Sequence, residues 1–365
     1  MLKIFLRPFS DGGGNLTAKI VAIYALLLAL NGLAWAWGLA AFHQHPVLLG
    51  TCFLAYSFGL RHAVDADHIA AIDNVTRKLM QEDKRPLTVG LFFSLGHSTV
   101  VILATIGVAL ATSAFRAQIE EFHAVGMMIG VSVSAAFLLV IAAINIVILV
   151  NVYGTFQRVK NGGSYVAADL DLQLANGGFF ARLFHRLFRA IRQSWHMYPL
   201  GFLFGLGFDT ATEIGLLGIA AAEATNGLPI WSILVFPALF TAGMTLLDTT
   251  NSVLMVGAYG WAFVKPVRKL YYNMTITFVS VVVAVLIGGI EALNLIAAKF
   301  ALTGGLWDAV GSLNDTFGTL GYVIIGVFAL SWLVSMALYH LKGYDRLEIE
   351  VSRQARATQS TPGMA

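Results

Sequence analysis

The sequence contains very little of what a soluble protein needs. Cys52 is the single cysteine among 365 residues, so an intrachain disulfide and a thiolate metal cluster are both excluded. Charged residues make up 12% of the chain, about half of their usual share. A chain with so few charges cannot cover itself with polar surface in water. This excludes a soluble enzyme, a nucleic-acid-binding protein and a disordered tail protein.

Apolar residues are abundant instead. They form 58% of the chain, and the mean hydropathy is +0.75. A helix that crosses a bilayer needs about 20 apolar residues, and the sequence offers eight such stretches. We therefore expect an all-α integral membrane protein with eight transmembrane helices at Ala18–Phe42, Pro46–Asp73, Thr88–Thr112, Ala124–Tyr153, Tyr198–Ala222, Trp231–Gly260, Tyr271–Ala298 and Gly318–Leu341.

The basic residues predict how these helices are oriented. With the N-terminus placed inside, twenty of the 23 lysines and arginines fall in the inside segments. The outside loops hold only Arg116 and Lys299, and Arg61 lies within a span. Short cytoplasmic loops are enriched in basic residues. The pattern therefore predicts a multi-pass protein of the cytoplasmic (inner) membrane with both termini in the cytoplasm.

The same reading divides the chain into five segments. Residues 1–17 form a cytoplasmic N-terminus, 18–153 the first four helices, 154–197 a cytoplasmic loop, 198–341 the last four helices, and 342–365 a cytoplasmic tail. The loop contains FFARLFHRLFRAIRQSW, with arginines on one helical face and large apolar side chains on the other. This pattern is typical of an amphipathic helix lying on anionic headgroups.

Polar residues within the spans are candidates for function, because an ionisable group at mid-membrane costs about 2.5–3.5 kcal/mol. They concentrate in four spans, in the strings RHAVDADHIAAID, LGHST, GFDTATE and GMTLLDTTN, and the first span adds one asparagine. The candidates are His62, Asp65, Asp67, His68, His97, Asp209, Glu213, Asp248, Asn251 and Asn31.

Helical geometry relates the residues of the second span. At about 100° per residue, His62, Asp65 and His68 share one face, whereas Asp67 points to a different side. Either Asp67 meets another helix, or the helix unwinds here and brings all four residues together.

Depth in the membrane gives a second relation. Each residue of a helix adds about 1.5 Å of depth. Counted from the outer ends of their spans, His62 and Asp248 reach one level. Counted from the inner ends of their spans, His97 and Asp209 reach the same level. This level lies slightly inward of the bilayer midplane. A single buried site that ions reach from both sides would have this arrangement.

The residue types indicate the class of ligand. Imidazole and carboxylate groups together suit divalent cations such as Ni²⁺, Co²⁺ and Zn²⁺. A Cu⁺ site would need thiolates, and an all-carboxylate Ca²⁺ or Mg²⁺ cage would not need the histidines. The residues themselves therefore predict a site for a borderline divalent cation, without choosing among the three.

Taken together, these strings resemble the nickel/cobalt transporter family of membrane permeases. The resemblance rests on RHAVDADHI, LGHSTVV, GFDTATE and GMTLLDT, and it covers roughly residues 18–341. It implies a high-affinity permease with His62, Asp67 and His68 central to the metal site and Asp65 beside them. The sixth-span motif of the family usually ends in an acid, but this chain has Asn251 there.

The expected function is thus uptake of Ni²⁺, and possibly Co²⁺, as transported substrate, with no cofactor. We expect Asn31, His97, Asp209, Glu213, Asp248 and Asn251 to orient the ligands or to line the ion pathway. No GxxxxGK[ST] string is present, so no ATPase is evident and the permease would be secondary. An intramembrane metalloenzyme and a proton- or sodium-coupled antiporter are the alternatives. The sequence leaves the oligomeric state and the coupling ion open.

Overall fold

The computed structural model describes residues 10–12, 14–110, 116–160, 191–206, 211–262 and 266–341. The described residues form helices and contain no strand. The helices are α2 (Leu16–Phe42), α3 (Pro46–His62), α4 (Ala66–Gln81), α5 (Val89–Leu110), α6 (Arg116–Lys160), the 3₁₀ turn η3 (Ser194–His196), α9 (Met197–Gly205), α10 (Ala211–Thr225), α11 (Ile230–Ile233), α12 (Val235–Ala262), α13 (Pro266–Phe300), α14 (Gly305–Asp315) and α15 (Phe317–Leu341). The all-α prediction is confirmed.

Six helical stretches of the described chain are long and apolar enough to cross a membrane. They are Leu16–Phe42, Val89–Leu110, Val131–Arg158, Ile230–Gly260, Met274–Phe300 and Leu320–Tyr339. Their outward faces carry large exposed apolar side chains, such as Leu28 and Leu33 of α2. In water such surfaces would be very costly, and in lipid they are expected. The chain is therefore a multi-pass membrane protein.

The other two predicted spans differ from the expectation. The second is a bent pair, α3 and α4, whose axes meet at 51°. The fifth consists of two short helices, α9 and α10, on either side of a stretch that lies partly outside the described residues. The count of eight spans and the position of the termini thus stay predictions. The amphipathic helix predicted within residues 154–197 also falls mostly outside the described part, which resumes at 191.

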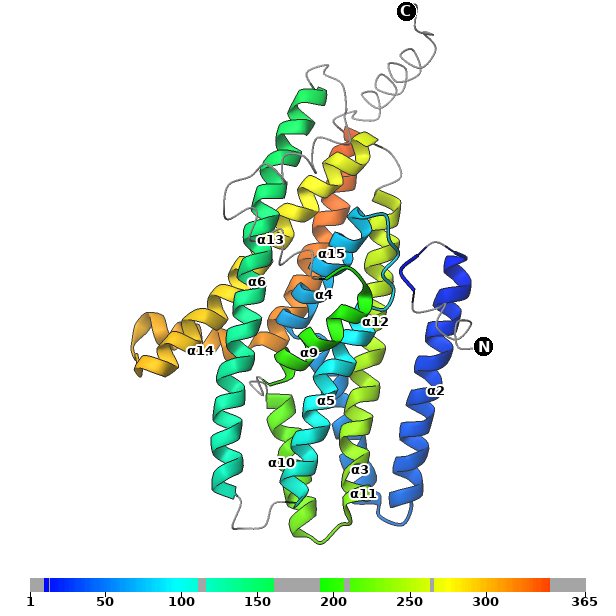
Figure 1. Cartoon of the computed structure of the whole chain (residues 1–365), viewed down its shortest axis with the longest axis vertical. Coiled ribbons are helices and arrows are strands. Elements are labelled where there is room, and N and C mark those ends of the chain that lie inside the picture. The colour runs from blue at the N-terminus through cyan, green and yellow to red at the C-terminus, as the bar shows by residue number, and fades with distance from the viewer. Residues whose placement is uncertain are drawn as a thin grey trace, which may run out of the picture.

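The helices form two groups around α4 (Figure 1). In one group, α12 packs against α2, α3 and α5, and α5 packs against α9 and α10. In the other, α13 packs against α6, α14 and α15. Helix α4 contacts members of both groups, and every residue from His68 to Met80 is buried. A short polar helix therefore occupies the centre of the bundle.

Glycine lets the helices that carry polar residues approach very closely. A Cβ atom on Gly59 of α3 would lie 2.0 Å from the carbonyl oxygen of Phe240 on α12. A Cβ on Gly321 of α15 would lie 1.5 Å from the carbonyl oxygen of Val64, at the break between α3 and α4. Small residues that allow such backbone contact are typical of helix packing in membranes. These contacts fix α12 and α15 against the broken helix.

Candidate metal centre

The break between α3 and α4 is built around Asp65. Helix α3 ends at His62, and Asp65 occupies the N-cap position of α4 in an extended conformation, with φ −65° and ψ 149°. Aspartate is a preferred N-cap residue, but here its side chain makes no capping hydrogen bond. Its Oδ2 instead accepts a hydrogen bond from Nδ1 of His62 at 2.8 Å. The unwinding that the sequence left open is thus present in the structure.

Three histidines meet beside this break. His62 and His68 come from the broken pair and His97 from α5, and one nitrogen of each lies within 4.8 Å of those of the other two. The ring centroids are 4.6 Å apart for His62 and His68, 4.7 Å for His62 and His97, and 5.0 Å for His68 and His97. None of the three is more than 2% exposed. The cluster is therefore enclosed within the bundle.

Buried acids from two further helices contact these imidazoles. Nδ1 of His68 donates to Oδ2 of Asp248 on α12 at 3.1 Å, and the Ser94 hydroxyl donates to the same oxygen at 2.6 Å. Nε2 of His97 lies 2.8 Å from Oε1 of Glu213 on α10. The polar residues of four predicted spans thus lie around one centre, and Ser94 is a contributor that the sequence reading did not name. Its position one turn before His97 is the signal that could have indicated it.

The acids determine which nitrogen of each ring carries the proton. An ionised carboxylate only accepts hydrogen bonds, so His62 and His68 hold their protons on Nδ1 and present the lone pairs of Nε2 toward the cluster. By the same rule His97 holds its proton on Nε2, which faces Glu213, and this proton has to move before Nε2 can bind a cation. Nε2 of His68 has no hydrogen-bond partner among the described residues. Histidine that is held at one nitrogen by a carboxylate and free at the other is arranged as a metal ligand is.

Asp67 occupies a different position from the other three residues of the motif. It lies in the first turn of α4 and is partly exposed. Its charge acts on both His62 and His68, but its Oδ1 is buried without a hydrogen-bond partner in the described part of the chain. Carboxylates near a helix N-terminus are favoured by the helix dipole. Asp67 therefore adds negative charge to the cluster without a direct bond to an imidazole.

The remaining candidates lie at the edge of the cluster or outside it. Nδ2 of Asn31 donates to the carbonyl oxygens of Leu27 and Ala242, at 2.8 and 3.2 Å. The Asn31 amide therefore lies in the contact between α2 and α12. Asn251 lies one turn beyond Asp248 on α12. Asp209 falls outside the described residues.

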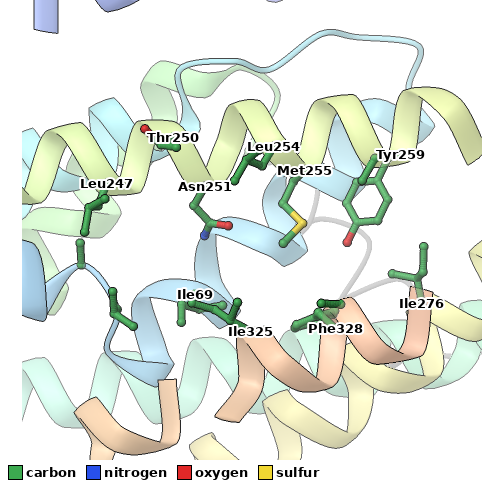
Figure 2. Close-up of a pocket in the computed structure, with 14 residues that line it drawn as sticks. Ile69, Leu247, Thr250, Asn251, Leu254, Met255, Tyr259, Ile276, Ile325 and Phe328 are labelled. Carbon is green, nitrogen blue, oxygen red and sulfur yellow. The ribbon is translucent and has the colours of Figure 1, made fainter. Parts of the chain in front are cut away.

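Asn251 faces a separate cavity of about 320 Å³ between α12, α15 and the α3–α4 break. Figure 2 shows its side chain directed from α12 toward Ile69 and Ile325. Apart from Asn251, Thr250 and the Tyr259 hydroxyl, the lining is apolar. This cavity adjoins the histidine cluster, but none of the three histidines lines it.

Comparison with known proteins identifies the relatives of the chain. The model of the NicO family, described as high-affinity nickel-transport protein, matches residues 48–338. A high-affinity nickel transport protein of Cupriavidus necator is 61% identical over 349 residues, which cover 96% of this chain and 99% of that protein. A nickel transporter of Staphylococcus aureus is 42% identical, covering 90% and 95%. A cobalt transport protein of Rhodococcus rhodochrous is 40% identical, covering 81% and 84%. No solved structure gives a significant match.

Proposed function

Because the chain belongs to the NicO family of high-affinity nickel-transport proteins, we propose that it imports Ni²⁺, and to a lesser extent Co²⁺, across the cytoplasmic membrane. Its relatives bear the names of transport proteins, which assigns it to a transport family and not to an enzyme family. The metal ion is the transported substrate. It is held between α3, α4, α5 and α10 by the three histidines and Glu213.

The observation that carries the proposal is the enclosed set of imidazoles. Three histidines and the acids Asp65, Glu213 and Asp248 would have little reason to be buried together in lipid without a cation. Borderline divalent ions prefer imidazole nitrogen, with carboxylate oxygen as a further ligand.

The ligand atoms lie close enough together to share one ion. Two ligand atoms about 2.1 Å from one metal lie about 3.0 Å apart at a right angle and about 3.4 Å apart at the tetrahedral angle. The Nε2 atoms of His62 and His97 are 3.0 Å apart, and Nε2 of His97 is 2.8 Å from Oε1 of Glu213, each at hydrogen-bond distance. A bound cation would take the place of these hydrogen bonds, and the preference for Ni²⁺ is proposed from the relatives, which are named for nickel.

We propose the membrane potential as the driving force. A divalent cation gains about 4.6 kcal/mol for each 100 mV of inside-negative potential. In proteoliposomes, a potassium diffusion potential set by valinomycin should therefore drive ⁶³Ni²⁺ uptake without a pH or sodium gradient. Uptake that needs an imposed proton or sodium gradient instead would contradict this part of the proposal and support ion-coupled transport.

The metal site is tested by replacing each histidine with glutamine. We expect His62→Gln, His68→Gln and His97→Gln each to weaken ⁶³Ni²⁺ uptake at nanomolar concentration by about 100-fold or more, since losing a ligand should exceed the 10–100-fold cost of losing a residue that supports one. His43→Gln is the matched control, because His43 is exposed at the end of α2. Uptake close to wild type in any of the first three variants would remove that histidine from the site.

A further inference from the structure

Two phenyl rings lie directly against the histidine cluster. The ring of Phe93 on α5 stands edge-on to that of His68, with centroids 4.8 Å apart and an interplanar angle of 88°. The ring of Phe240 on α12 lies against His62, with centroids 5.6 Å apart and an angle of 35°. Both phenylalanines are 0% exposed. Each of the two histidines of the broken helix thus has an aromatic neighbour of its own.

The hydrogen bonds described above do not fully fix the orientation of these imidazole rings. A carboxylate holds His68 at Nδ1, and another holds His62 at Nδ1. A single hydrogen bond tolerates a spread of angles, so a ring held at Nδ1 can still rock through small changes of its two side-chain torsions that keep this nitrogen near its carboxylate. A rigid phenyl ring against the imidazole removes part of this freedom. The direction of each Nε2 lone pair is therefore set by an acid and a phenyl ring together.

The two phenyl rings are themselves held firmly. Phe93 packs edge-on against Phe204 of α9 at 5.3 Å, and Phe204 packs against Phe137 of α6 at 5.9 Å. The backbone of Phe240 lies so close to α3 that Gly59, one turn before His62, has no room for a Cβ atom. The ring of Phe93 is thus packed against a further ring, and the backbone that carries Phe240 is fixed against α3.

We propose that Phe93 and Phe240 are positioning residues that fix the orientations of His68 and His62 and thereby favour Ni²⁺ over Co²⁺. The inference rests on the proposed function of the cluster. Ni²⁺ and Co²⁺ are adjacent in the affinity order for such ligands, so a site separates them by the geometry it imposes. Within this proposal, fixed imidazoles hold the arrangement that suits Ni²⁺. Imidazoles that can turn allow Co²⁺ to draw them toward a tetrahedral arrangement.

The first test measures Ni²⁺ and Co²⁺ uptake in parallel in Phe93→Leu and Phe240→Leu. An edge-to-face aromatic pair contributes about 0.5–1.5 kcal/mol, which corresponds to about a two- to tenfold change in an equilibrium ratio. We expect the Ni/Co uptake ratio to fall by this factor, more strongly in Phe93→Leu because its contact is the closer one.

The controls are Phe42→Leu and Phe236→Leu. Both phenylalanines are at most 1% exposed, and their rings stack on each other with centroids 5.6 Å apart. These variants lose the same side-chain volume inside the bundle as the test variants do. An equal fall of the Ni/Co ratio in these controls would mean that loosened packing, and not ring positioning, changes selectivity, and this would overturn the proposal.

The second test reads the geometry directly from purified protein. Co²⁺ absorbs visible light weakly in six-coordinate sites and much more strongly in tetrahedral ones. We expect weak bands in the wild type and in both controls, and clearly stronger bands in Phe93→Leu. An unchanged ratio together with an unchanged spectrum in both test variants would overturn the positioning role while leaving the metal site itself intact. A wild-type protein that binds neither metal would instead overturn the proposed function.

Discussion

At the scale of single residues, the Asp248 carboxylate links α12 to Ser94 of α5 and to the imidazole of His68. Its Oδ2 accepts from Nδ1 of His68 and from the hydroxyl of Ser94. Such a carboxylate fixes the tautomer of the histidine and raises the basicity of its other nitrogen. The proposed binding of a cation by His68 therefore depends on a residue 180 positions away in the chain.

Replacing this acid should weaken metal binding without removing a ligand. We expect Asp248→Asn to lower the affinity for Ni²⁺ by about 10–100-fold, as measured by calorimetry on purified protein and by the KM of uptake. Ser94→Ala, which leaves the bond between His68 and Asp248 in place, should cost less than Asp248→Asn. If Asp248→Asn binds Ni²⁺ as tightly as the wild type, Asp248 does not orient His68.

The sequence indicated which residue types gather at one level, but not which acid contacts which histidine. The pairing depends on how each helix is rotated about its axis, and close backbone contacts set this rotation. A Cβ on Gly90 of α5, for example, would lie 2.0 Å from the carbonyl oxygen of Asp248. Asn31 shows the same point. The sequence placed it among the residues expected to orient the ligands or to line the ion pathway, but α2 lies against α12, and the amide donates to Ala242.

At the scale of helices, the contact between α15 and the α3–α4 break is the closest glycine contact of the described chain. Gly321 is buried there, and only a hydrogen atom fits between its Cα and the carbonyl oxygen of Val64. Because the break carries His62 and His68 on its two sides, the position of α15 bears on the metal site.

A methyl group at this position should force α15 away from the break. We expect Gly321→Ala to destabilise the detergent-solubilised protein by about 1–3 kcal/mol, as overpacking does, and to slow Ni²⁺ uptake. Gly326→Ala, one turn and a half along the same helix, has nothing within 4 Å of its added Cβ. This control should be neutral, or stabilised by up to about 1 kcal/mol through helix propensity. Equal unfolding temperatures for the two variants would contradict the close contact.

Helix boundaries were predictable where apolar runs are uninterrupted, and less so elsewhere. Helix α2 begins at Leu16 and ends at Phe42, close to the predicted Ala18–Phe42. Hydropathy alone predicts one continuous span at Tyr198–Ala222. Its string GFLFGLGFDT contains three glycines, which lower helix propensity, and α9 ends at Gly205. Helix α14 was not predicted, because it is too short to register as a span.

At the scale of the whole molecule, a buried polar network ties α4 to both helix groups. Asp73 of α4 accepts hydrogen bonds from the hydroxyls of Tyr259 on α12 and Ser280 on α13. One turn further, Arg77 donates to Thr277 of α13 at 2.7 Å. Asn145 of α6 donates to Asn74 of α4 at 2.7 Å. The polar central helix is thus held by hydrogen bonds rather than by apolar packing alone.

Removing one donor of this network should weaken the whole bundle. We expect Tyr259→Phe to lower the free energy of unfolding by about 1–3 kcal/mol, because the buried Asp73 carboxylate loses a hydrogen bond. Tyr322→Phe on α15, where the side chain is 59% exposed, should change it by less than about 0.5 kcal/mol. Thermal unfolding in detergent measures both. A Tyr259→Phe variant as stable as the wild type would show that the network adds nothing to stability.

The enclosure of the three histidines also limits how fast ions can cross at the proposed site. With no imidazole more than 2% exposed, an ion cannot diffuse through as it does through a pore, and each passage requires the helices to rearrange. Collective helix motions take on the order of microseconds to milliseconds. Once its site is saturated, each molecule therefore delivers ions at a fixed rate whatever the outside concentration. A cell that needs more metal from such a protein has to make more copies of it.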